Sequence, residues 1–254
     1  MGNVRTLILR APGTNCDEET AFAFQQAGAE TSLVHVGQLI RREQKLTNYQ
    51  IMVFPGGFTY GDDLGAGKVL ANEMKLRLGE DIQRFVARGC LILGICNGFQ
   101  VLVKTGILPG IKGEQKLTLT TNDSGRFECR WVYLKINGKN KCVFTTGIEH
   151  LYLPVAHGEG KVVAEAGFLS HVDAAVYYTD RQGKRNAGYP YNPNGSIKDI
   201  AGICDTTGRI FALMPHPERH ILPSQHPTWP QGEAGKQENG LKIFINAVEW
   251  IKKL

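Results

Sequence analysis

Short apolar runs separated by helix-like stretches are the feature that most constrains the fold of this chain. The runs of strand length in the first hundred residues are Thr6–Leu9, Ser32–Val36, Ile51–Phe54 and Leu91–Ile95. Between them, Glu18–Ala27 and Glu80–Ala87 have the spacing of helices. Strands that are apolar on both faces belong in a parallel sheet covered by helices on both sides. We therefore expect an α/β fold with a doubly wound, mostly parallel central sheet, and with function at the carboxyl ends of its strands.

From about residue 115 the pattern changes to short strands with alternating polarity. These are expected at Lys116–Thr120, Glu128–Ile136 and Val172–Tyr178, and they predict an added antiparallel β subregion. Paired strands at Asp199–Cys204 and Arg209–Met214 follow, and an amphipathic helix runs from about Gly240 to Lys253. We expect residues 1–254 to form a single domain.

Composition excludes several classes of protein. No stretch approaches the about 18 consecutive apolar residues of a membrane helix, and no signal peptide precedes the first strand, so we expect a cytoplasmic protein without membrane contact. The net charge of +5 is mild and its basic residues are scattered, which does not favour nucleic-acid binding. The 6 cysteines contain no C-x-x-C pair, so neither a zinc ribbon nor a disulfide scaffold is indicated, and five of them are expected to be structural.

Cys96 stands where the apolar run Leu91–Ile95 meets the sequence Gly94-Ile95-Cys96-Asn97-Gly98. This G-x-C-x-G spacing is typical of a nucleophile in a strained strand-to-helix turn, where glycines let the neighbouring backbone pass closely. The following helix directs its unpaired N–H groups at the sulfur, which favours the reactive thiolate, and we expect the sulfur to be exposed. A packed structural cysteine remains the alternative.

His216 and Glu218 follow the last expected strand in the sequence Pro215-His216-Pro217-Glu218. A cysteine nucleophile needs an imidazole to take its proton, and the imidazole needs a carboxylate to fix its tautomer. In extended chain, residues i and i+2 project to the same side, so we expect His216 and Glu218 to lie side by side facing Cys96. Taken alone, His216 fits a satisfied loop histidine better than a catalytic one, and its position at a strand end beside Glu218 reverses this preference.

Two backbone N–H groups, those of Gly57 and Asn97, are candidates for an oxyanion hole. Gly57 follows the strand Ile51–Phe54, and Asn97 follows the candidate nucleophile, so both lie at carboxyl ends of strands. One such donor contributes about 10²–10³ in rate to acyl transfer. A plain turn at Gly56-Gly57 is the alternative interpretation.

Pro-Gly-Gly, then Gly-Ile-Cys-Asn-Gly-Phe-Gln, then Pro-His-Pro-Glu occur here in the order found in the triad glutamine amidotransferases, which this chain resembles. The resemblance implies hydrolysis of L-glutamine through a γ-glutamyl thioester on Cys96. It implies His216 as general base and acid, Glu218 as its orienting partner, and Gly57 and Asn97 as oxyanion donors. It also implies that Gln100 holds the α-amino and carboxylate end of the substrate; a polar residue on the helix surface is the alternative for Gln100.

Further stretches resemble one branch of this family, glutaminase subunits that serve purine biosynthesis. They include GTNCDEET at 13–20, NDSGRFECRW at 122–131 and LPVAHGEGK at 153–161. The resemblance implies a large synthetase subunit as partner, which binds ATP, magnesium and formylglycinamide ribonucleotide and receives the ammonia. A small accessory subunit is left open as a further partner. No G-x-x-x-x-G-K-[ST] motif occurs, so no cofactor is expected in this chain.

Several features stay open or predict little. Arg126, Arg130, His157 and Glu159 are expected to be solvated loop residues or a partner-facing surface. His220 and His226 lack further ligands at suitable spacing, so no metal site is expected. Segments around 137–153, 181–191 and 228–240 are longer than in compact versions of the subunit. Alternative functions are an amidotransferase subunit of another pathway, a cysteine peptidase or thioester hydrolase on a similar scaffold, and a binding subunit with an idle triad.

Overall fold

The structure is a computed structural model that describes residues 3–110, 115–229 and 239–254. Its helices are α1 (Asp17–Gln26), α2 (Val36–Ile40), α3 (Lys68–Ala87), α4 (Asn97–Lys104) and α5 (Leu241–Lys252). Its strands are β1 (Arg5–Arg10), β2 (Glu30–His35), β3 (Ile51–Phe54), β4 (Leu91–Ile95), β5 (Leu117–Thr120), β6 (Glu128–Ile136), β7 (His150–His157), β8 (Lys161–Ala164), β9 (Asp173–Thr179), β10 (Ile200–Cys204) and β11 (Ile210–Leu213).

A large mixed sheet forms the centre of the described molecule, in the strand order β2-β1-β3-β4-β11-β10-β9-β6-β7. The first five strands in this order pair in parallel, and the remaining four pair antiparallel. The order reverses between β1 and β3, which is the switch point where open α/β sheets bind ligands. The expected α/β fold, with a mostly parallel sheet and an antiparallel addition, is confirmed.

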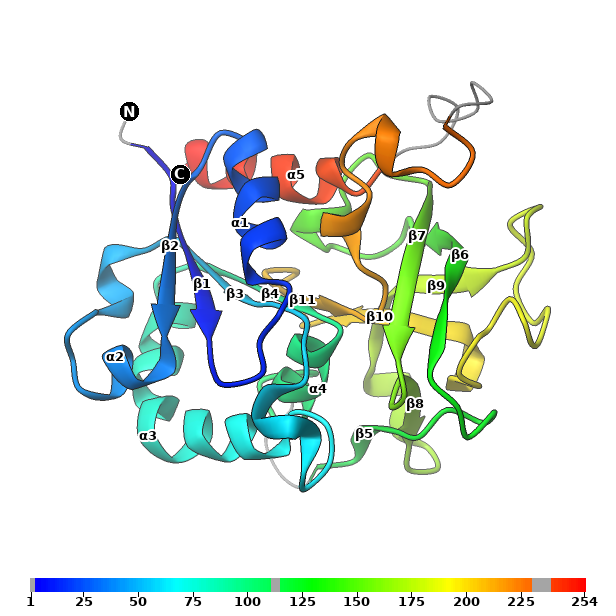
Figure 1. The fold of residues 1–254 in the computed structure, drawn as a ribbon, viewed down its shortest axis with the longest axis horizontal. Helices are drawn as coiled ribbons and strands as arrows, with labels where there is room; N and C mark the ends of the chain where they lie inside the picture. Colours follow the sequence, from blue (N-terminus) through cyan, green and yellow to red (C-terminus); the bar gives the residue numbers. More distant parts are fainter. Residues whose placement is uncertain (1–2, 111–114, 230–238) are drawn as a thin grey trace.

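Helices cover both faces of the parallel half (Figure 1). Helices α1 and α5 contact each other on one face, and α3 and α4 contact each other on the other. Strands β3, β4 and β11 are buried at every residue, because both of their faces are covered. Among the described residues, no helix is both long and apolar enough to cross a lipid bilayer.

Strand β7 at the outer edge of the antiparallel half returns to the carboxyl ends of the parallel strands. The backbone N–H of His216, just after β11, donates to the carbonyl of Pro154 in β7 at 2.8 Å. Neither β7 nor β8 was predicted from the sequence. Pro154 interrupts the strand signal of β7, yet proline is tolerated in a strand at the edge of a sheet.

The three longer segments differ in structure. Residues 137–153 contain a 3₁₀ turn at Val143–Thr145 and the first part of β7, and residues 181–191 lie in the loop after β9. Of the third segment, 228–240, residues 230–238 lie outside the described part of the chain.

Candidate active site

Cys96 occupies a strained turn between β4 and α4. Its backbone angles are φ 51° and ψ −104°, a conformation that non-glycine residues rarely adopt. Its N–H donates to the carbonyl of Leu213 at the end of β11 at 2.8 Å, which joins the two strand ends. Cys96 is only 5% exposed, so the expectation of an exposed sulfur was wrong. The carbonyl of Ala156 in β7 covers the sulfur and accepts from its thiol at 3.6 Å.

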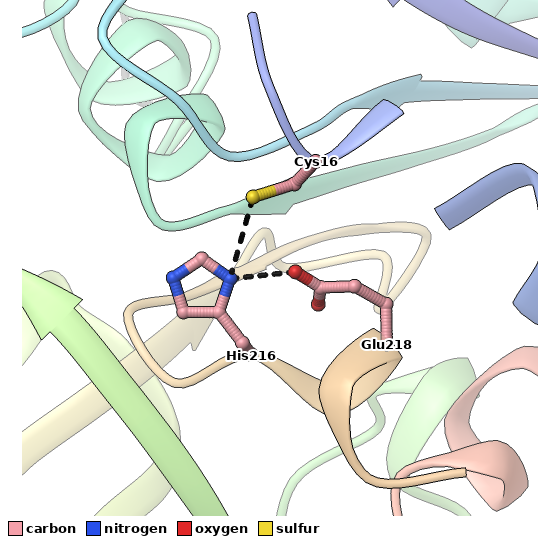
Figure 2. Close-up of side chains that lie close together, drawn as sticks. All are labelled: Cys16, His216 and Glu218. Carbon is pink, nitrogen blue, oxygen red and sulfur yellow. Dashed lines mark hydrogen bonds and ion pairs between the residues drawn. The ribbon is translucent and has the colours of Figure 1, made fainter. Parts of the chain in front are cut away.

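His216 and Glu218 form a buried pair directly after β11. His216 Nδ1 lies 2.6 Å from Glu218 Oε1, and the two residues are 2% and 0% exposed (Figure 2). The expected proximity is confirmed, but its stated cause was wrong, because Glu218 lies in a 3₁₀ turn at Pro217–Arg219 rather than in extended chain. The turn bends the carboxylate back toward the ring of His216.

The electrostatics of the pair suit proton transfer at the second ring nitrogen of His216. Burial lowers the pKa of His216, whereas the charge of Glu218, followed by that of Cys96, raises it. The raising effects together outweigh burial, so the pKa lies well above its usual value. Because Nδ1 is hydrogen-bonded to Glu218, Nε2 is the ring nitrogen that remains to exchange a proton. Within the described residues, Nε2 is buried and has no hydrogen-bond partner.

The loop after β3 holds Gly57 in a conformation that only glycine adopts easily, with φ 147°. The N–H of Phe58 donates to the Gly13 carbonyl at 2.9 Å, and the N–H of Asn15 donates to the Gly56 carbonyl at 3.4 Å. These two bonds flank the facing pair of Thr14 and Gly57. In such a pair the N–H of Gly57 points away from the Gly13–Asn15 segment and stays available to a ligand.

Asn97 and Gln100 lie on the first turn of α4 and are buried, at 1% and 4% exposed. The Asn97 side chain accepts from the Thr59 hydroxyl at 2.7 Å and donates to Gln100 Oε1 at 2.9 Å. Gln100 Nε2 donates to the Glu159 carbonyl at 2.5 Å. Gln100 is therefore no surface residue: it joins α4 to the loop after β7.

Cys16 is a residue of this site that was not predicted from the sequence, because all cysteines but one were expected to be structural. Its Sγ lies 4.0 Å from His216 Nδ1, and Arg219 Nη2 donates to it at 3.0 Å. Donor atoms of Cys16, His216 and Glu218 lie within 4.8 Å of one another, a set of the kind that holds metals. The Arg219 guanidinium already supplies positive charge there. The available signal was the position of Cys16, six residues beyond β1 at the carboxyl edge of the sheet.

His157, at the end of β7, is a second buried histidine near His216, not the loop or surface residue that was expected. Asn122 Nδ2 donates to two carbonyls, those of Arg126 and His157, so Asn122 Oδ1 must be the acceptor for His157 Nδ1 at 3.1 Å. This bond places the ring proton on Nδ1. Burial and then the charge of His216 lower the pKa of His157 to about 3, so its ring is neutral at physiological pH.

Comparison with known proteins connects this geometry to a family. Residues 3–251 match the CobB/CobQ-like glutamine amidotransferase domain. The chain belongs to this glutamine amidotransferase family. A relative named phosphoribosylformylglycinamidine synthase subunit PurQ, from Dehalococcoides mccartyi, is 60% identical over 255 residues and 100% of both chains. A subunit of the same name from Methanococcus maripaludis is 45% identical over 98% of both chains.

One solved structure has the same fold over nearly the whole chain. It is a chain in the structure of PurLQS from Thermotoga maritima, with a TM-score of 0.76 and 32% identity over 98% of this chain and 100% of that one. Cys96, His216 and Glu218 thus lie in an amidotransferase fold. Cys96 follows β4, and His216 and Glu218 follow β11.

Proposed function

We propose that this chain is a glutaminase that hydrolyses L-glutamine through a thioester on Cys96. The observation that carries the proposal is the buried His216–Glu218 pair beside the strained Cys96 turn, in a chain of the amidotransferase family. Each of the three residues stands at the carboxyl end of a strand in the parallel half of the sheet. Cysteine, imidazole and carboxylate are the groups that covalent acyl transfer requires.

In the first half of the reaction, His216 Nε2 takes the proton of the Cys96 thiol, and the thiolate attacks the γ-amide carbon of glutamine. The negative charge that develops on the amide oxygen faces the backbone N–H groups of Gly57 and Asn97. His216 then gives its proton to the amide nitrogen. The carbon–nitrogen bond breaks, ammonia leaves, and a γ-glutamyl thioester remains on Cys96.

In the second half, water attacks the thioester carbon while His216 Nε2 takes a proton from that water. The carbon–sulfur bond breaks, glutamate leaves, and the thiol of Cys96 is restored by the proton that His216 held. Glu218 keeps the imidazole in the Nδ1–H tautomer and stabilises its charged form throughout. In the free chain the thiol points at the Ala156 carbonyl, so it must rotate toward His216 before reaction.

The substrate and pathway follow from the family and from the named relatives. We propose that Gln100 helps to hold the α-amino and carboxylate end of glutamine. We also propose that the ammonia serves a separate ATP-dependent synthetase that converts formylglycinamide ribonucleotide to formylglycinamidine ribonucleotide, as the name of the D. mccartyi relative supports. ATP and magnesium are then bound by that synthetase, and this chain needs no cofactor for hydrolysis.

The partner and location are parts of the same proposal. The related T. maritima chain belongs to the structure of an assembly, PurLQS, which supports a synthetase as the partner of this chain. We propose that the partners are a large synthetase subunit and a small accessory subunit. All 6 cysteines are free, as expected in a reducing compartment, and we propose a cytoplasmic location.

Replacing Cys96 by alanine tests the proposed function. Assayed with its synthetase, ATP and formylglycinamide ribonucleotide, Cys96→Ala should lose glutamine-dependent turnover by at least about 10⁴-fold. Turnover with added ammonia should persist, because the synthetase is unchanged. Cys90→Ala is the matched control, since Cys90 is a buried thiol under the Tyr49 carbonyl, away from the site.

Two results would contradict the proposal. Retained glutamine-dependent turnover in Cys96→Ala would show that another group forms the acyl intermediate. Faster turnover of peptides or esters than of glutamine by the unaltered chain would instead favour a peptidase or thioester hydrolase. Both arms use purified proteins and measure glutamate or product release directly.

A further inference from the structure

A second thiol, that of Cys16, lies against the His216–Glu218 pair. Cys16 is 1% exposed and precedes α1, and its Sγ lies 4.0 Å from Nδ1 of His216, the nitrogen that Glu218 holds (Figure 2). The proposed hydrolysis does not use this thiol. Its position on the side of the ring away from Nε2 makes it a candidate for holding the ring in place.

Two polar contacts, besides the one with His216, fix the Cys16 thiol itself. It donates to Asn15 Oδ1 at 3.1 Å and accepts from Arg219 Nη2 at 3.0 Å. The same guanidinium lies 3.5 Å from Glu19 through Nε and 4.0 Å from Glu218 Oε1. Burial raises the pKa of Cys16, so its thiol stays neutral and adds no second negative charge beside Glu218.

The same thiol also contacts the loop that carries Gly57. A Cβ atom at Gly56 would lie 2.8 Å from His216 Cε1 and 3.0 Å from Cys16 Sγ, so ring and thiol together fill the space that a side chain would need. The N–H of Cys16 donates to the Gly56 carbonyl at 3.2 Å. Cys16 therefore contacts both the loop that carries Gly57 and the imidazole of His216.

We propose that Cys16 is a positioning residue, whose neutral thiol, held by Arg219 and Asn15, fixes the imidazole of His216 between Glu218 and the loop that carries Gly57. This inference rests on the proposed glutaminase function. Without the thiol, the ring gains room to rotate away from Glu218 and from the Cys96 sulfur. A misplacement of about 1 Å is enough to cost about 10²-fold in rate.

The test compares Cys16→Ala and Cys16→Ser with Cys90→Ala, which removes a buried thiol elsewhere in the core. In the complex with the synthetase, we expect Cys16→Ala to lower kcat for glutamine hydrolysis at least about 10-fold while KM stays within about 2-fold. Cys16→Ser, which keeps a group that accepts from Arg219, should recover part of this loss. Cys90→Ala should keep the unaltered kcat.

A pH profile and an NMR measurement separate positioning from a merely structural role. The titratable and charged groups around His216 are Glu218 and Arg219 after β11, Cys16 before α1, Cys96 after β4 and His157 at the end of β7. The Cys16 contact raises the pKa of His216, so Cys16→Ala should move the acidic limb of kcat/KM to lower pH. In spectra of ¹⁵N-histidine-labelled protein, the Nδ1–H proton of His216 should shift upfield as its bond to Glu218 weakens.

Specific results would overturn the positioning role. One is a folded Cys16→Ala protein with unaltered kcat, pH profile and Nδ1–H signal. Another is a loss of activity that only follows the fraction of folded protein. If the unaltered chain shows no glutaminase activity even with its synthetase, the proposed function fails, and the NMR signal still decides whether Cys16 positions His216. Should Cys16→Ala not fold, the same comparison uses Cys16→Ser.

Discussion

At the residue scale, Glu218 is a fully buried carboxylate whose negative charge raises the pKa of His216. Glu218 Oε1 lies 2.6 Å from His216 Nδ1, which is not the nitrogen proposed to transfer the proton. The charge of Glu218 therefore acts on the ring without blocking Nε2. Its charge is the largest of the effects that raise the pKa of His216 against burial. The proposed catalytic imidazole therefore depends on this carboxylate, more than on any other neighbour, for its raised pKa.

Glu218→Gln should lower glutamine turnover by at least about 10²-fold with little change in KM. The amide keeps the shape of the side chain but cannot stabilise the imidazolium that forms during the reaction. Without the carboxylate, the pKa of His216 should fall, which an NMR titration of labelled histidine measures directly. Glu249→Gln on α5, which removes a half-exposed carboxylate that pairs with Lys252 3.6 Å away, serves as the control.

The same substitution should change how stability depends on pH. Because the pKa of His216 is raised in the folded chain, the pair stabilises the fold fully below the unfolded pKa of about 6.5, and this stabilisation is lost as pH rises through the folded value. The free energy of unfolding of the unaltered chain should exceed that of Glu218→Gln most near pH 6. An equal difference at pH 6 and pH 9, measured in urea, would contradict this coupling.

At the element scale, the close contact of α4 with β3 brings Asn97 against the loop that carries Gly57. Gly98 on the first turn of α4 has no room for a side chain, because a Cβ atom there would overlap the carbonyl of Phe54 at the end of β3. Gly98, two residues after Cys96, is thus required for close packing between α4 and β3. It lets Asn97 approach the loop that carries Gly57.

Gly98→Ala should destabilise the fold by about 3 kcal/mol and lower glutamine turnover, since β3 and α4 must separate. Gly79→Ala is the matched control, because no atom of the described residues, apart from chain neighbours and the adjoining helix backbone, lies within 4 Å of the Cβ position of this glycine inside α3. There the substitution should stabilise the chain by about 0.5–1 kcal/mol through helix propensity. Urea unfolding measures both changes, and equal effects at the two glycines would refute the packing role of Gly98.

Elements with strong periodicity were predicted from sequence closely, and those whose stability depends on neighbours were not. The bounds of β3, β4 and β6 agree with expectation residue by residue. Helix α3 is an exception: it begins at Lys68, twelve residues before the expected stretch, although Leu70, Met74 and Leu78 continue its helical spacing toward the N-terminus. Strand β7 depends on pairing with β6 along eight residues.

At the scale of the whole molecule, the site is shared between both halves of the sheet. Strands β3, β4 and β11 of the parallel half carry the proposed catalytic groups, and β7 of the antiparallel half covers them through the Pro154 and Ala156 carbonyls. The antiparallel half of the sheet thus forms one side of the site. Hydrogen bonding continues from β2 to β7 across one sheet. That residues 1–254 form a single domain stays a prediction.

If the chain unfolds as a single cooperative unit, we expect one unfolding transition. Calorimetric and van't Hoff enthalpies should agree, and glutaminase activity should be lost at the same urea concentration as the circular dichroism signal. Two separate transitions, with the antiparallel half melting first, would contradict the single-domain prediction. Measuring activity and spectra on the same samples makes the comparison direct.

The sequence by itself determined the alternation of strands and helices in the parallel half, the Cys96 turn and the short His216-x-Glu218 spacing, because these depend on local periodicity and on neighbours in the chain. Only the tertiary structure revealed Cys16, Arg219 and His157 around the imidazole. Cys16 and His216 are 200 residues apart, and nothing local in the sequence specifies their contact. Burial of the Cys96 sulfur was likewise decided by β7, since a strand from the other half of the sheet must pack over the turn before the thiol is covered.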